Sequence, residues 1–146
     1  MYLNSPEAIE IVYSDLEKVA ERVGDISPGV YERFFTRSEM GRNTMGHSDE
    51  HMRGRMLEQV LELMFDDRHL EPGGYLDWEL ENHIDAYGVD PSMYADFFDA
   101  FVEEIAAGLD ADWDETHRVA WQQRIDAILK VVGTYEARTA EKSAAI

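Results

Sequence analysis

The sequence predicts an all-α fold, and three observations lead to this prediction. Apolar residues recur with helical spacing along most of the 146 residues, and no stretch alternates apolar and polar residues as a half-buried strand does. A Ser-Pro or Asp-Pro pair stands before several of these stretches, as is typical of helix starts, and glycines follow several of them. We therefore expect about six or seven helices, in one domain over residues 1–146.

The first half of the chain contains three expected helices. Ser5-Pro6 begins the first, because Ser can cap a helix and Pro lacks only an N–H that the first turn leaves unused. Gly24 is expected to end this helix, and Ser27-Pro28 to begin a short second one. Residues 40–47 include two glycines and are expected to be irregular, and Ser48 is expected to cap the third helix. The apolar residues that would face the core are Ile9, Val12, Leu16, Val19, Val30, Tyr31, Phe34, Phe35, Met52, Met56, Leu57, Val60, Leu61 and Met64.

The second half begins after Pro72-Gly73-Gly74, a sequence that is expected to interrupt the helices with a turn. A helix of about three turns is expected over residues 76–87, and Gly88 would end it. Asp90-Pro91 begins the next helix, and Asp112 with Glu115 forms a capping box for the last one. The polar tail, residues 137–146, is expected to fray. The apolar faces here are Leu76, Leu80, Ile84, Tyr87, Tyr94, Phe97, Phe98, Phe101, Ile105, Leu109, Val119, Ile125, Ile128, Leu129 and Val132.

The composition excludes several classes of function. The chain has 31 acidic and 13 basic side chains, a net charge of −18 and no cysteine. Without cysteine there is no disulfide, thiolate zinc site, iron–sulfur cluster or cysteine nucleophile. The acidity disfavours nucleic acid and anionic membranes as partners, because both bind clustered Lys and Arg. No signal-peptide pattern or long apolar run is visible, so we expect a soluble, cytoplasmic protein.

The charge is unevenly distributed along the chain. Residues 66–115 contain 16 acidic residues and one basic residue, whereas residues 33–55 contain five arginines. A solvated acidic surface explains the first segment, and a docking face for a basic partner is the alternative. The arginines are either ordinary surface residues or a cluster that holds a buried anion.

The histidines are the residues best suited to chemistry in this sequence. His47 and His51 are four residues apart and could share a metal ion, but the helix start expected at Ser48 would separate them. His83 lies on or beside the apolar face of its helix. It is either a hydrogen-bonded core residue or an axial ligand to haem iron, which needs a neutral imidazole in an apolar pocket.

Four segments resemble the bacterial haem globins in order and spacing, and the similarity runs from about Glu17 to Glu136. They are V-Y-E-R-F-F at 30–35, H-S-D-E-H-M-R-G-R-M-L at 47–57, H-I-D-A-Y-G-V-D-P-S-M-Y at 83–94, and D-A-D-W to V-A-W ending at Trp121. The resemblance implies a globin fold that binds haem b.

On the proximal side, the resemblance implies that His83 ligates the iron, although a different register would place Ile84 there. Tyr87 would contact the cofactor. Tyr94 and Glu136 match a Tyr and a Glu of the flavohaemoglobin globin domain, where they form a network behind the proximal histidine. A carboxylate near such an imidazole makes it a stronger electron donor; otherwise Tyr94 is a core residue and Glu136 a surface residue.

On the distal side, Tyr31 matches the haem-facing Tyr of bacterial globins that donates a hydrogen bond to oxygen. Arg53 falls at the distal polar position and Leu57 one turn later, with a register that depends on a gap after Met45. Met45 replaces the Phe that normally stacks on haem, and methionine is adaptable enough to fill that place. The haem propionates would be held by Arg42, Arg53 or Arg55.

The resemblance implies a haem protein that binds O₂, NO or CO, as a monomer or homodimer. It would bind oxygen reversibly, or act as an NO dioxygenase or peroxidase-like oxidoreductase with a separate reductase that docks on the acidic segment. The alternatives are a gas-sensing or regulatory globin-fold module, with or without haem, and a helical metal protein that uses His47 and His51.

Overall fold

The computed structural model describes residues 2–144, and this part of the chain is helical without any strand, which confirms the all-α prediction. Three short helices, η1 to η3, separate or extend the seven α-helices. The α-helices are α1 Ser5–Val23, α2 Ser27–Arg37, α3 Glu39–Met45, α4 Glu50–Phe65, α5 Tyr75–Leu80, α6 Ser92–Leu109 and α7 Glu115–Ala144. The short helices are η1 Asp67–Leu70, η2 Glu81–Ala86 and η3 Asp110–Asp112.

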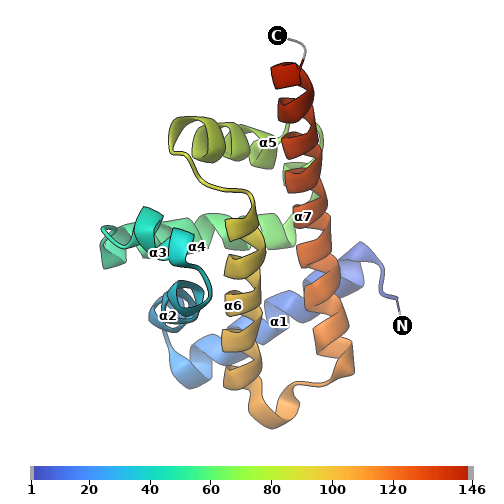
Figure 1. The fold of residues 1–146 in the computed structure, drawn as a ribbon. Coiled ribbons are helices and arrows are strands. Elements are labelled where there is room, and N and C mark those ends of the chain that lie inside the picture. The colour runs from blue at the N-terminus through green and yellow to red at the C-terminus, as the bar shows by residue number, and fades with distance from the viewer. Residues whose placement is uncertain (1, 145–146) are drawn as a thin grey trace.

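The helices pack in crossed layers rather than as a parallel bundle. In Figure 1, α6 and α7 stand upright in front, while α1 and α4 cross behind them. The most extensive contacts join α2 to α6 and α1 to α7. Helix α5 and η2 lie beside the C-terminal half of α7, at one end of the molecule, and α4 lies below them (Figure 1).

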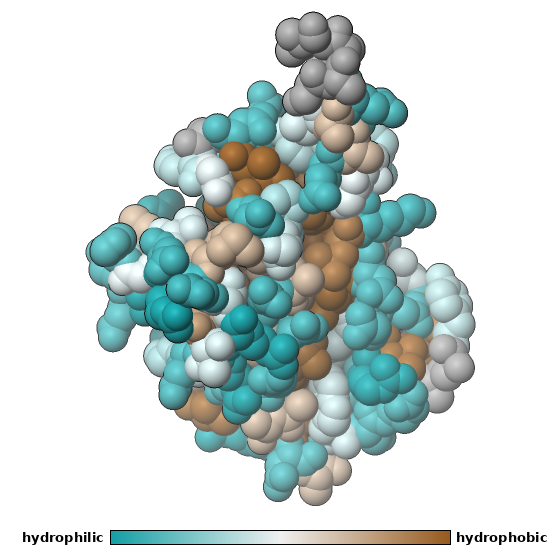
Figure 2. Space-filling view, in the orientation of Figure 1, coloured by the Kyte–Doolittle hydropathy of each residue, from teal (hydrophilic) through white to brown (hydrophobic). Residues whose placement is uncertain are grey.

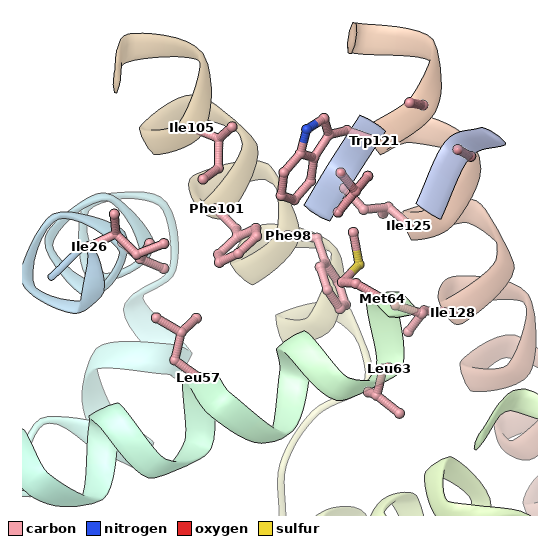
Figure 3. Close-up of a cluster of buried hydrophobic side chains, with 14 of the residues drawn as sticks. Ile26, Leu57, Leu63, Met64, Phe98, Phe101, Ile105, Trp121, Ile125 and Ile128 are labelled. Carbon is pink, nitrogen blue, oxygen red and sulfur yellow. The ribbon is translucent and has the colours of Figure 1, made fainter. Parts of the chain in front are cut away.

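The core forms where α4, α6 and α7 meet. Figure 3 shows Phe98, Phe101 and Ile105 of α6 facing Trp121, Ile125 and Ile128 of α7, with Leu57, Leu63 and Met64 contributed by α4. The rings of Phe101 and Trp121 are 5.4 Å apart between centroids. Each buried side chain of this size contributes about 1.5–3 kcal/mol through the loss of its apolar surface from water. The apolar stripes predicted from the sequence supply most of this core. Leu63 and Trp121 were not among the predicted residues, and Met52, predicted to face the core, is 52% exposed.

The outer face carries the charge. Figure 2 shows hydrophilic side chains over most of the visible surface, as a net charge of −18 requires. Part of the acidic segment is neutralised within the fold, because Arg33 of α2 bonds Glu104 of α6 at 2.9 Å and Arg37 pairs with Glu103. These ion pairs stabilise the α2–α6 contact. No helix in the described residues is long and apolar enough to cross a membrane.

The helix starts are shifted from the predicted capping residues. The side chain of Asn4, instead of Ser5, accepts the N–H of Glu7 at 2.9 Å at the start of α1. The residue that caps α4 is Asp49 and not Ser48, and the residue that caps α7 is Asp114 and not Asp112. In each case the cap is an Asn or Asp one or two residues from the predicted position. The side-chain oxygen of Asn or Asp accepts a hydrogen bond from a backbone N–H of the first helical turn.

Residues 40–47 are not irregular as predicted, because α3 runs through Glu39–Met45. Ser38 caps this helix by accepting the N–H of Gly41 at 2.8 Å. Gly41 is present for packing: a Cβ there would lie 2.4 Å from the ring of Phe34. The glycine that suggested a helix break therefore permits close approach of α3 to α2.

The expected helix over residues 76–87 changes its winding at the middle. It begins as α5 and continues from Glu81 to Ala86 as a π-helix. Gly88, two residues later, has a φ of 67° and ends the helical segment as predicted. The backbone N–H of Val89 bonds the carbonyl of His83 at 3.0 Å. π-Helical turns are often found at functional sites, because the wider turn displaces side chains from the regular helical register.

The final helix runs as far as Ala144, and residues 145–146 lie outside the described part of the chain. The fraying expected for residues 137–146 stays a prediction. One contact joins this part of α7 to α5, and a second is local to α7. The guanidinium of Arg138 bonds Asp77 of α5 at 3.1 Å, and the hydroxyl of Thr139 bonds the backbone carbonyl of Tyr135 at 3.0 Å. The alanines of the segment also favour a helix, because Ala has the highest helix propensity.

A buried arginine fixes the end of α4 against α7. The side chain of Arg124 is 3% exposed. Its guanidinium donates to the backbone carbonyls of Met64 at 2.9 Å and Leu63 at 3.2 Å, and to Asp67. These carbonyls belong to the last turn of α4, where no backbone N–H follows to bond them. Arg124 thereby caps one helix from another.

We expect Arg124→Met to lower the free energy of unfolding by about 2–4 kcal/mol, because it leaves two buried carbonyls without donors. Urea denaturation measures this change. The matched control is Arg118→Met on the same helix, because Arg118 is 52% exposed and pairs only with Glu115; its loss should cost less than about 1 kcal/mol. Equal losses in the two variants would contradict the capping role.

Candidate functional site

A cavity of about 640 Å³ lies between α4 on one side and α5, η2 and the start of α6 on the other. Its walls are largely apolar and aromatic, and its volume is in the range of cavities that hold small organic ligands. The lining residues that the sequence singled out are Tyr31, Met45, His47, His83, Tyr87 and Tyr94. The cavity is therefore formed where the resemblance implies a cofactor.

His83 is held in this cavity from both ring nitrogens. Its Nδ1 lies 3.1 Å from the hydroxyl of Tyr94, and its Nε2 lies 3.0 Å from a carboxylate oxygen of Glu79. Because a carboxylate only accepts, Nε2 carries the proton in this contact; in the neutral ring, Nδ1 then accepts from Tyr94. Ile84, the alternative to His83, does not line the large cavity but a second one of about 250 Å³.

The contact to His83 is part of a chain of hydrogen bonds. The hydroxyl of Tyr75 donates to the other oxygen of Glu79 at 3.2 Å. Tyr75, Glu79 and His83 are spaced by four residues, which places them on one side of α5 and η2. Burial and the negative charge of Glu79 raise the pKa of Tyr94 above its ordinary value, and the same two causes raise that of Tyr75 to about 12.

Glu136 does not take part in this network. Its side chain is exposed and lines the smaller cavity, while the neighbouring Tyr135 bonds Asp85 at 2.9 Å. The structure thus brings Tyr94 to His83, as the resemblance implied, but supplies the carboxylate from Glu79. Sequence reasoning missed Glu79, although its spacing of four residues before His83 was visible in the sequence.

Tyr31 is buried on the opposite wall and lines the cavity. Its hydroxyl donates to the backbone carbonyl of Arg53 at 3.3 Å. Its ring packs edge-on against Phe97 at 5.6 Å between centroids. Burial raises the pKa of Tyr31 to about 12, opposed by the positive charge of Arg53, so the hydroxyl keeps its proton throughout the neutral range.

The expected distal residues of α4 are shifted in register. Neither Arg53 nor Leu57 lines the cavity: Leu57 is buried in the core, and the guanidinium of Arg53 lies 4.9 Å from the ring of Phe35 and bonds Ser48 at 2.9 Å. The expected register depended on a gap after Met45, and a shift of one residue leads from Arg53 to Met52 and from Leu57 to Met56, both of which line the cavity. The residues of α4 that face the cavity are Met52, Met56, Gln59, Val60 and Leu63.

The polar groups that line the cavity are not the arginines expected to hold the haem propionates. No lysine or arginine of the described residues lines the cavity, so Arg42, Arg53 and Arg55 are not placed to hold an anion there. The guanidinium of Arg42 instead bonds the carbonyl of Phe35. Thr44, His47 and Ser48 are polar residues of the lining, and Tyr87 contributes a ring that is 68% exposed.

The idea of a metal site at His47 and His51 gains no support from the geometry. His47 lies in the turn after α3, and His51 lies in the first turn of α4. Both side chains are exposed. Across the residues that the structure describes, no group of three or more His, Asp or Glu could hold a metal ion.

The buried tyrosines predict a loss of stability in alkali. Tyrosines of the unfolded chain ionise near pH 10, whereas Tyr31 and Tyr75 retain their protons to about pH 12 in the folded chain. Above pH 10 the unfolded state therefore binds fewer protons, and the free energy of unfolding falls as the pH rises from 10 to 12. Urea denaturation measures the free energy of unfolding at pH 9 and at pH 11. Between these two pH values it should fall less in Tyr31→Phe than in the unchanged protein. An equal fall in the free energy of unfolding in the two proteins would contradict the raised pKa of Tyr31.

Comparison with known proteins identifies the family. A model of the Globin family matches residues 33–132. A solved structure from Pseudomonas aeruginosa PAO1, described as structurally highly homologous to a human hemoglobin, is similar with a TM-score of 0.75 and 19% identity; the match covers 88% of this chain and 97% of that chain. At this identity the likeness shows a shared fold. No curated protein matches the sequence. Because the family match spans more than half of its residues, this chain belongs to the globin family.

Proposed function

We propose that this globin binds haem b in the large cavity, through Nε2 of His83, and that it reversibly binds a diatomic gas, O₂, NO or CO. The observation that carries the proposal is the placement of His83. Its imidazole lines a cavity of about 640 Å³ with largely apolar walls, and Tyr94 fixes its other nitrogen. A metal-ligating histidine typically donates a hydrogen bond from its second ring nitrogen. With iron at Nε2, the imidazole would therefore carry its proton on Nδ1 and donate it to the hydroxyl of Tyr94.

The residues of the cavity fit the cofactor in chemistry as well as in size. Met45, Val60, Leu63 and Phe98 supply apolar walls, and methionine can adapt to a flat ring where the family usually has Phe. Thr44, His47 and Ser48 supply hydrogen-bonding groups for carboxylates, in place of the expected arginines. When bound, haem would supply the iron that binds the gas.

The chain's own residues would orient the ligand and control access to it. Tyr94 holds Nδ1 of His83 and so fixes the direction of the imidazole. Tyr31 offers a protonated hydroxyl inside the cavity, and its present bond to the carbonyl of Arg53 is long enough to be exchanged for another. The apolar walls limit the water that can enter. Reaction with NO and the use of a separate reductase remain predictions from the family resemblance.

The visible spectrum of the hemin-loaded protein tests the proposed ligand. We expect a Soret band in the unchanged protein, and in His83→Ala a shifted band with hemin binding at least about tenfold weaker. Added imidazole should restore the spectrum by occupying the vacated position. His51→Ala is the matched control, because His51 is exposed and lies outside the cavity lining. Loss of the band in His47→Ala with its retention in His83→Ala would contradict the proposal.

Tyr31→Phe tests the distal hydroxyl. Removing one hydrogen-bond donor should cost about 1 kcal/mol of gas binding, or roughly fivefold in affinity. The ferrous protein should also oxidise faster in air, which the decay of its visible spectrum measures. An unchanged oxygen affinity and oxidation rate would show that Tyr31 only fills space.

A further inference from the structure

The carboxylate of Glu79 contacts the same ring nitrogen of His83 that the proposed function assigns to iron. The two atoms, Oε2 of Glu79 and Nε2 of His83, are 3.0 Å apart. The Glu79 side chain is only 10% exposed and lines the same cavity. Tyr75 orients it through the other carboxylate oxygen. Glu79 therefore faces the cavity as a positioned group rather than as a surface side chain.

We propose that Glu79 is an internal competitor of haem for His83. In the haem-free chain its carboxylate bonds Nε2 and keeps the imidazole in place inside the cavity. Haem iron and the carboxylate cannot occupy Nε2 together, so uptake of haem requires this bond to break. The inference rests on the proposed function and adds a control on the loading of that site.

Two physical effects make Glu79 oppose the binding of haem. A hydrogen bond from an imidazole to a buried carboxylate is stronger than one between neutral groups, and its loss opposes haem binding by roughly ten- to a hundredfold. Once displaced, Glu79 retains Tyr75 as a donor but remains a poorly solvated anion beside a cofactor that carries two carboxylates. No lysine or arginine in the described part of the cavity wall compensates this charge.

Glu79 and Tyr94 give the imidazole of His83 a hydrogen-bond partner on each ring nitrogen. The side chain of His83 is 25% exposed, and a partly buried polar group of this kind is most stable when its nitrogens are hydrogen-bonded. The position of His83 is therefore held by hydrogen bonds to this chain's own residues.

Hemin titration of the purified full chain tests the proposal. Followed at the Soret band, Glu79→Leu should bind hemin at least about tenfold more tightly than the unchanged protein, because it removes the competing acceptor. Glu79→Gln, which keeps the shape but not the charge, should lie between them. Glu81→Gln is the matched control, since Glu81 begins the π-helix η2 two residues after Glu79, is exposed and loses the same charge. Its affinity should stay within about twofold of the unchanged protein.

A second measurement does not depend on haem. In the ¹⁵N NMR spectrum of the haem-free protein, the Nε2 signal of His83 should shift in Glu79→Leu and stay in place in Glu81→Gln. Unchanged hemin affinity in both Glu79 variants, with a Soret band that still depends on His83, would overturn the competition and leave the proposed function intact. A band that does not depend on His83 in any variant would overturn both. Weaker hemin binding in Glu79→Gln would show that Glu79 assists haem binding, and would also overturn the inference.

Discussion

The proposed site depends on holding the imidazole of His83 in one position on the cavity wall. The imidazole of His83 satisfies this requirement because Tyr94 and Glu79 bond its two nitrogens, and Tyr75 bonds Glu79 in turn. These bonds join α5, η2 and α6, so the position of His83 is fixed by three elements. Those elements are positioned by the rest of the fold: ion pairs and aromatic contacts hold α2 against α6, and the buried side chain of Arg124 fixes the end of α4 against α7.

The sequence predicted the fold class and the central histidine because both depend on local patterns. Helical spacing of apolar residues placed the core faces, and Gly24 and Gly88 end their helices with positive φ as expected. The capping residues were shifted by one or two positions because several Asn, Asp and Ser side chains compete for the same backbone N–H groups. The π-turn around His83 could not be predicted, since its signal lies in tertiary packing rather than in the sequence pattern.

Where the structure places site residues differently from the expectation, contacts between distant segments account for the difference. The register of α4 depended on an assumed gap, so Arg53 and Leu57 were expected where Met52 and Met56 stand. Glu136 was expected beside His83 from the family pattern, but it is exposed, and Glu79 occupies the cavity instead. The four-residue spacing of Tyr75, Glu79 and His83 was a local signal that could have revealed this network. Its importance becomes apparent only when the burial of Glu79 is known, because most acidic residues in so acidic a chain face water.

The central claim is that His83 binds haem iron in the cavity between α4 and η2. A crystal structure of the protein with hemin tests this claim most directly. The account predicts iron bound to Nε2 of His83, Tyr94 still bonded to Nδ1, and the carboxylate of Glu79 moved away from the imidazole. Iron bound to His47 or to no histidine, or haem located outside this cavity, would contradict it.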